Sequence, residues 1–331
     1  MSPELSCRAT FMFGFERSGT TLLSMMMGAH PQLAVPLTVT GLWYSYGQRL
    51  DDYNDLQTDR DVERLVGDLL KEERISLWDE PLSREDIMEV LENRSFPSVV
   101  QAFHIAYASK KSKPLWANLD IATLDEMDTA YQWFPNARFI HIVRDGRDVA
   151  LSHETMPFGS SNTLDCARSW NRRLTINQKM GRILKSSQYK TIRFEDLVNE
   201  SESTLTELCE FIGVEYSPRM LEYGDMVAGK IPENRRWLWP ELDKKPQSSK
   251  CYGWKTKMAE KKRIVFEGHA GKVLSNLGYE IYENTPKMLS AYLYELWCYV
   301  GTQGRYRRLG RKLGVSQMSL LEKQWKKNHG S

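Results

Sequence analysis

Arginine and hydroxyl side chains follow the first apolar segment of the chain. The apolar residues 9–15 predict a buried strand, and residues 19–29 predict a helix that stops at His30-Pro31. The turn between them is Gly14-Phe15-Glu16-Arg17-Ser18-Gly19-Thr20-Thr21. Such a turn points successive backbone N–H groups into one concavity, and the positive end of the helix dipole adds to them. The segment therefore predicts an anion-binding loop in which Arg17 contacts a phosphate or sulfonate oxygen.

This loop is close to a Walker A sequence but lacks its lysine. Gly14 and Gly19 have the spacing of G-x-x-x-x-G-K-[ST], yet Thr20 stands at the lysine position. A nucleotide triphosphatase needs that lysine on the β- and γ-phosphates, so a P-loop kinase is the least favoured alternative. A plain strand–helix turn capped by Ser18 and Thr20 is the structural alternative. The whole Arg-Ser-Gly-Thr-Thr string in a strand–loop–helix setting favours the anion site.

A second anion-binding group is expected after the strand predicted at residues 138–143. Arg144 follows that strand, where ligands bind in open α/β sheets. Ser152 lies about two helical turns further on if a helix begins near Asp145. An arginine fork with a hydroxyl could hold a second phosphate, while Arg147 and its neighbour Asp148 are expected to form structural pairs. Two such strand ends predict a ligand with two separated anionic groups.

The elements that must position these residues alternate between strand and helix. This pattern predicts an α/β fold with a P-loop-like central parallel sheet flanked by helices. Further strands are expected at 115–118 and 190–194, and further helices at 122–133, 163–185, 195–212 and 259–277. We expect a single domain, residues 1–331. It should contain a helical insertion at about 45–112, an irregular lid-like loop at about 224–256 and a basic helical tail at about 286–331. A capping box that starts at Ser83 supports the helical character of the insertion.

Composition limits the partners and the compartment. The net charge of +2 does not argue for nucleic acid, and no segment approaches the roughly 20 apolar residues of a membrane span. The five cysteines are dispersed without C-x-x-C spacing, which predicts reduced thiols and no metal site. With no export signal at the N-terminus, the expected location is cytoplasmic. The basic tail is interpreted as a solvated helical face, with a surface or partner contact as the alternative.

The two anion-binding segments resemble the two signatures of PAPS-dependent sulfotransferases, where PAPS is 3′-phosphoadenosine-5′-phosphosulfate. The string at 17–21 is similar to the R-S-G-T-T loop of the bacterial and tyrosylprotein branches, and Arg144 with Ser152 resembles the second signature. The likeness extends through residues 134–138, 193–197 and 278–279. It therefore covers most of residues 9–283.

The resemblance implies a sulfotransferase of the EC 2.8.2 class and a role for each matching position. It would transfer a sulfuryl group from PAPS to a hydroxyl or amine of a small-molecule acceptor, such as a specialised metabolite, leaving PAP and needing no metal. Arg144 and Ser152 would hold the 3′-phosphate. Lys250, Gly253 and Lys255 lie in a segment that looks like the late basic loop over the nucleotide. The 5′-phosphosulfate would be held by Arg17, Ser18, Gly19, Thr20 and Thr21.

The sequence departs from this family at two catalytic positions. Thr38 lies in the segment where many relatives carry a catalytic glutamate, and Leu119 stands at the place of a family lysine. These departures motivate a second hypothesis, a sulfotransferase-like protein that binds the nucleotide without catalysis. An acceptor that needs little help from a base, such as an amine, would also explain the missing glutamate.

Asp120 is the preferred candidate for the general base. It follows the predicted strand at 115–118, close to where cytosolic relatives place a catalytic histidine, although an N-cap role fits the same position equally well. His104 and His153 are alternative bases, because histidine titrates near neutral pH. Aromatic residues either belong to the core or line an acceptor pocket; they are Trp43, Tyr44, Tyr46, Trp237 and Trp239.

Overall fold

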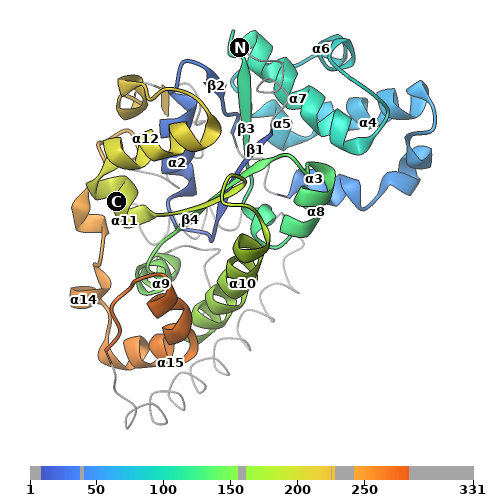
Figure 1. The fold of residues 1–331 in the computed structure, drawn as a ribbon. Coiled ribbons are helices and arrows are strands. Elements are labelled where there is room, and N and C mark those ends of the chain that lie inside the picture. The colour runs from blue at the N-terminus through green and yellow to red at the C-terminus, as the bar shows by residue number, and fades with distance from the viewer. Residues whose placement is uncertain (1–8, 38–40, 156–161, 225, 228–241, 283–331) are drawn as a thin grey trace, which may run out of the picture. The chain divides into compact units, whose positions relative to one another are not determined.

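The computed structural model describes residues 9–37, 41–155, 162–224, 226–227 and 242–282 (Figure 1). Thr38, Trp237, Trp239 and the predicted basic tail lie outside these residues. The chain divides into two compact units. The first comprises Met1–Val143 with Lys179–Ser248, and the second comprises Arg144–Gln178 with Ser249–Ser331.

The first unit contains a five-stranded parallel sheet, which confirms the predicted fold class. The strand order is β2-β3-β1-β4-β5, and every pairing is parallel. All residues of β1 and β3 are buried, as expected for strands of a parallel sheet that is covered on both faces. The strands are β1 (Thr10–Gly14), β2 (Leu33–Ala34), β3 (Leu115–Leu119), β4 (Arg138–Val143) and β5 (Tyr189–Arg193).

Helices lie on both sides of this sheet in Figure 1. The α-helices of the first unit include α2 (Thr20–Gly28), α3 (Leu42–Gly47), α4 (Asp59–Lys71), α5 (Glu73–Ser76), α6 (Arg84–Glu89), α7 (Phe96–Lys110), α8 (Met127–Trp133), α11 (Phe194–Asn199) and α12 (Ser201–Ile212). Its 3-10 helices include η1 (Leu50–Leu56), η2 (Ile121–Leu124) and η3 (Pro218–Leu221). The predicted insertion at 45–112 is thus helical where it is described. Ser83 forms the expected capping box with Asp86 at the start of α6.

The second unit is helical in its described part. It contains α9 (Gly146–Glu154), α14 (Trp254–Lys257) and α15 (Glu260–Asn276), while α10 (Thr163–Ile183) contributes residues to both units. A 3-10 turn, η5 (Ser248–Lys250), lies at the boundary between the two ranges. None of the helices in the described ranges is long and apolar enough to cross a membrane.

Three predicted elements differ from the observed ones. The helix expected at 195–212 is two helices, because Glu200 has non-helical backbone angles (φ −131°, ψ 47°). The helix expected at 122–133 is split into η2 and α8, since the Asp120 side chain starts a separate 3-10 turn. The loop expected at 224–256 includes the short helix α14, whose first residue donates its N–H to a distant carboxylate.

Candidate functional site

The loop after β1 is held in a tight left-handed turn. Arg17 has a positive φ of 68° and Gly19 one of 91°. A Cβ on Gly19 would lie 2.3 Å from Cδ2 of Phe194, the first residue of α11, so the ring of Phe194 closes one side of the loop. The N–H of Ser18 donates to the Phe15 carbonyl at 3.0 Å. This turn leads straight into α2, whose first N–H groups have no partner within the helix.

The end of β1 also lies against the end of β4. Gly14 pairs with Ile142, and a Cβ on Gly14 would meet the Ile142 carbonyl oxygen at 2.4 Å. Only glycine fits there without moving the backbone. The carboxyl ends of β1 and β4 therefore meet at one edge of the sheet, and Arg144 is the residue that follows β4 in the chain.

The loop fits an anionic group. The Ser18 hydroxyl is fully buried and its Oγ has no hydrogen-bond partner among the described residues. A buried hydroxyl without a partner costs roughly 1–3 kcal/mol, and a ligand oxygen would relieve that cost. Thr20 is buried too, whereas Arg17 and Thr21 are half-buried. The N–H groups that begin α2 are suited to an anion, so the binding of one by residues 17–21 stays a prediction.

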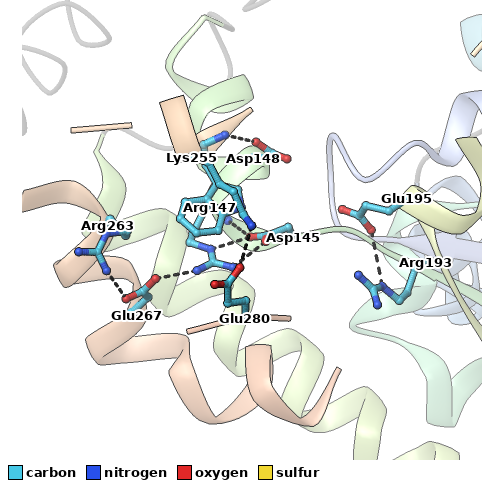
Figure 2. Close-up of polar contacts among 10 residues, drawn as sticks. Asp145, Arg147, Asp148, Arg193, Glu195, Lys255, Arg263, Glu267 and Glu280 are labelled. Atoms are coloured by element: carbon cyan, nitrogen blue, oxygen red, sulfur yellow. Dashed lines mark hydrogen bonds and ion pairs between the residues drawn. The ribbon is translucent and has the colours of Figure 1, made fainter. Parts of the chain in front are cut away.

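The segment around Phe194 positions the loop from outside. Arg193 and Glu195 flank Phe194, with the Arg193 Nε 3.9 Å from the Glu195 carboxylate, which is 1% exposed (Figure 2). The sequence likeness in residues 193–197 therefore has a physical basis, because the ring that packs on Gly19 belongs to that segment.

Gly19→Ala should lower the free energy of unfolding by more than about 1–2 kcal/mol. A Cβ in a left-handed conformation by itself costs about that amount, and the new Cβ also collides with Phe194. Urea unfolding measures the change. Gly271→Ala is the control: it lies within α15 and its Cβ meets nothing closer than 3.8 Å, so it should stabilise by about 0.5–1 kcal/mol. A Gly19→Ala protein as stable as wild type would contradict the tight packing of this loop.

Asp120 is buried at the end of β3 and binds two backbone N–H groups. It is 0% exposed, and it caps η2 by accepting the Ala122 N–H at 2.9 Å. Both of its oxygens lie 2.9 Å from the N of Gly41, the residue before α3. Burial raises the pKa of Asp120 to about 6, although these N–H groups lower it in part. The N-cap interpretation is therefore confirmed, while the role as a base stays a prediction.

This raised pKa predicts a pH dependence of stability. The Asp120 carboxyl has a pKa near 6 when folded and 3.8 when unfolded, so the folded state holds the proton more tightly between these values. Stability from this group is present below pH 4 and is lost as the pH rises towards 6. Asp120→Asn removes the effect, so the variant should gain up to about 3 kcal/mol relative to wild type between pH 4 and 7. Urea unfolding between pH 4 and 7 measures this difference in stability. If the stabilities of wild type and Asp120→Asn changed with pH in the same way, the raised pKa of Asp120 would be contradicted.

The aromatic residues of α3 belong to the core. Trp43, Tyr44 and Tyr46 are all buried, and the Tyr44 hydroxyl lies 2.7 Å from Oγ1 of Thr123. Leu119, at the place of the family lysine, is an apolar residue of β3 with 3% exposure. Of the two interpretations of these aromatic residues, the structure favours core packing.

His104 is enclosed by aromatic rings in α7. It is 0% exposed, its Nδ1 lies 2.8 Å from the Val100 carbonyl, and its ring stacks on Trp116 at 4.6 Å. The rings of Trp43 and Trp78 each lie 5.6 Å from it. Burial lowers the pKa of His104 to about 4. This environment favours a structural role over that of a base.

In the second unit, Arg144 and the first turn of α9 contact the late basic segment. Arg144 donates from Nη2 to the Lys250 carbonyl at 2.7 Å. Asp148 accepts the Trp254 N–H at 2.7 Å, and a Cβ on Gly253 would lie 3.6 Å from the same carboxylate oxygen. Arg144 thus contacts Lys250, and Gly253 lies beside Asp148, while the binding of a nucleotide by these residues stays a prediction.

The other predicted residues of this unit lie on α9 and α14. Ser152 is half-buried and His153 is buried, both in the last turn of α9. Lys255 lies on α14, is 43% exposed, and forms a 2.7 Å ion pair with Glu280 (Figure 2). A phosphate at Lys255 would therefore compete with this carboxylate.

Arg147 is the centre of a buried ion network. Its guanidinium is bonded through Nε and Nη2 to Asp145 at 2.9 and 2.8 Å, and through Nη1 to Glu267 at 2.6 Å. Arg263 binds the second oxygen of Glu267 at 2.8 Å (Figure 2). The expected structural pairing of Arg147 is confirmed. Sequence reasoning missed Glu267, which lies 120 positions away and has no local signal.

Comparison with known proteins shows to which family the chain belongs. The sulfotransferase family model matches residues 9–218, which include the loop after β1, Arg144 and Ser152. The chain belongs to the sulfotransferase family. This confirms the family identification made from the two signatures.

Curated sulfotransferases are distant relatives of this chain. It is 25% identical over 229 residues to a protein-tyrosine sulfotransferase of Drosophila melanogaster, covering 66% of this chain and 40% of that protein. It is 22% identical over 294 residues to protein-tyrosine sulfotransferase 2 of Gallus gallus, covering 83% and 70%. The matched region is thus less than half of the fly protein.

Solved sulfotransferase domains share the fold. The sulfotransferase domain of the Synechococcus PCC 7002 olefin synthase has a TM-score of 0.59 at 18% identity, covering 83% of this chain and 95% of that domain. The sulfotransferase domain from the curacin biosynthetic pathway has a TM-score of 0.57 at 18% identity, covering 83% and 99%. These likenesses bear on architecture alone.

Proposed function

We propose that this member of the sulfotransferase family transfers a sulfuryl group from PAPS to a hydroxyl or amine of a small-molecule acceptor. The observation that carries the proposal is the loop after β1, where Gly19 packs tightly against Phe194 and the buried Ser18 hydroxyl has no hydrogen-bond partner in the part of the chain that the structure describes. Such a loop at the carboxyl end of a sheet strand is suited to an anion. Family membership supports sulfuryl transfer over phosphoryl transfer.

The chain's own residues would bind the two ends of the nucleotide. The loop at 17–21 would donate N–H and hydroxyl hydrogen bonds to the 5′-phosphosulfate, with the Arg17 guanidinium stabilising charge on the sulfonate. Arg144 and Ser152 would bind the 3′-phosphate, and Lys250, Gly253 and Lys255 would contact the nucleotide from the late segment. When bound, PAPS supplies a sulfuryl group whose bond to the phosphate oxygen breaks as the bond to the acceptor forms, leaving PAP.

Asp120 is the proposed general base that takes the acceptor proton. The carboxyl pKa of about 6 is suited to this task, because a base works best when its pKa lies near the working pH. Its two N–H donors, Gly41 and Ala122, hold the carboxylate at the end of β3.

The direct test is transfer of labelled sulfate from PAPS to a panel of acceptors. Phenols, sugars, amines and alkaloid-like metabolites represent the small-molecule class. A tyrosine-containing peptide is included because the named relatives are protein-tyrosine sulfotransferases. Labelled product from a small molecule is expected. PAP binding without transfer to any acceptor would favour the nucleotide-binding alternative, and Mg²⁺-dependent ATP turnover would identify a kinase.

Arg144→Ala should weaken PAP binding by about tenfold to a hundredfold, because charge-assisted hydrogen bonds to a phosphate contribute about 1.5–3 kcal/mol. Titration calorimetry measures the dissociation constant. Binding of adenosine 5′-phosphosulfate, which lacks the 3′-phosphate, should change much less. Arg94→Ala is the control, since the side chain of that arginine is 54% exposed and forms a surface ion pair with Asp59. Unchanged PAP affinity in Arg144→Ala would remove Arg144 from the 3′-phosphate site.

A further inference from the structure

The segment from Lys250 to Trp254 is bound at both ends, by Arg144 just before α9 and by Asp148 in the first turn of α9. Arg144 donates to the carbonyl at one end, and Asp148 accepts the Trp254 N–H at the other, each at 2.7 Å. Both contacts join positions 106 residues apart in the sequence. Local sequence therefore cannot specify the conformation of this segment, and the tertiary contacts to α9 do so.

Asp148 provides the N-terminal cap of the short helix α14. Trp254 is the first residue of this four-residue helix, and the preceding Gly253 offers no side-chain cap. The first N–H groups of a helix have no intrahelical partner, and a helix this short is not stable by itself. The Asp148 carboxylate, which is 4% exposed, caps the helix from α9.

The ring of Trp254 also contacts α9, through Arg147. The guanidinium carbon of Arg147 lies 3.5 Å from the centroid of the indole, which is suited to a cation–π contact. Arg147 itself is fixed by Asp145 and Glu267, and all of these side chains are buried (Figure 2). Adjacent residues of α9, Arg147 and Asp148, thus hold the ring and the N–H of one tryptophan.

The negative charge of Asp148 is unfavourable for an anion-binding segment. Arg144 lies close enough to Asp148 to lower the pKa of that carboxyl, although burial raises it overall. A carboxylate beside an arginine that binds phosphate weakens the attraction between that arginine and the phosphate. Its presence is explained if Asp148 contributes by fixing the backbone of the segment.

We infer that Asp148 is a positioning residue, which holds the Lys250–Trp254 segment in its nucleotide-binding conformation before the nucleotide arrives. The inference rests on the proposed function, since it assigns this segment to PAPS. A segment ordered in advance loses less conformational entropy on binding, so the contact appears as nucleotide affinity. Asp148 need not touch the nucleotide to have this effect.

Asp148→Ala should weaken PAP binding about tenfold, as expected for loss of a buried hydrogen bond that orders the segment. The Trp254 N–H should exchange with solvent about tenfold faster or more in the protein without nucleotide, because its acceptor is gone. At saturating PAPS, kcat should stay within about threefold of wild type, so the effect lies in KM. Calorimetry, hydrogen exchange and steady-state kinetics give these three readouts.

Two matched variants separate the hydrogen bond from the charge and from general effects on α9. Asp148→Asn keeps an acceptor oxygen and loses the charge, so PAP affinity and Trp254 exchange should stay within about threefold of wild type. Glu154→Gln removes an exposed ion pair with Lys262 from the same helix, and neither readout should change.

Rapid exchange of the Trp254 N–H in the wild-type protein would overturn the inference. So would an Asp148→Ala protein in which either the exchange rate of this N–H or the affinity for PAP is unchanged. A tenfold loss of PAP affinity in Asp148→Asn would overturn it as well. If circular dichroism shows that Asp148→Ala does not fold, the inference is tested by the exchange rate of the Trp254 N–H in the wild-type protein and by the PAP affinity of Asp148→Asn. Failure of wild type to bind PAP would instead end the proposed function. PAP binding that Asp148→Ala leaves intact would end only the role of Asp148.

Discussion

Asp120→Asn should lower kcat by about 10²–10⁴, the usual contribution of a general base, while the dissociation constant for PAP stays nearly unchanged. Asparagine has the shape of aspartate and keeps a carbonyl oxygen for the N–H groups of Gly41 and Ala122. It cannot take a proton from the acceptor. The substitution therefore separates the two roles of this side chain, and steady-state kinetics with the best acceptor measures the loss.

The pH profile provides an independent readout of the same role. Because burial raises the pKa of Asp120 to about 6, wild-type kcat should fall about tenfold per pH unit below that value. Asp120→Asn should lack this decline. Asp120→Ala is the matched comparison, since it removes the cap as well as the base and should also lose stability. Wild-type turnover in Asp120→Asn would leave Asp120 as a cap only and reopen His153 as a candidate.

Arg17→Ala should lower kcat by about 10²–10³, the typical effect of removing one preorganised donor that stabilises charge in the transition state. The positive φ at residue 17 is as unfavourable for alanine as for arginine, so the substitution leaves the backbone preference nearly unchanged. Single-turnover transfer of labelled sulfate isolates the chemical step. Arg17→Lys should recover only part of the rate, because lysine keeps the charge but loses the planar fork.

Arg60→Ala is the control for this experiment. Arg60 is exposed on α4, and its loss should leave kcat within about twofold of wild type. If Arg17→Ala retained full kcat and changed only the affinity for PAP, Arg17 would bind the nucleotide equally in ground and transition states. If both kcat and affinity were unchanged, the loop after β1 would not be the sulfonate site.

Strand positions were predictable because a central parallel strand carries its own signal. The bounds of β4 agree with the expectation, since Phe139, Ile140, Ile142 and Val143 give it a dense run of buried apolar, largely β-branched residues. β2 escaped notice because only Leu33 and Ala34 pair with β3, which is too short for any periodicity. The break at Glu200 was equally hidden, since one residue with non-helical angles leaves the helical pattern on both sides intact.

The chemistry of the loop after β1 was readable from the sequence alone, because its residues are contiguous and their spacing reflects the local geometry of a strand–helix turn. The string at 17–21 predicts an anion site, and together with Arg144 and Ser152 it indicates the family that the family model confirms. Tertiary structure decided matters that depend on distant residues: Phe194 against Gly19, Gly41 on Asp120, and Asp148 under Trp254. The physical reason is that packing, burial and pKa shifts arise between residues far apart in the chain, and no short-range pattern encodes them.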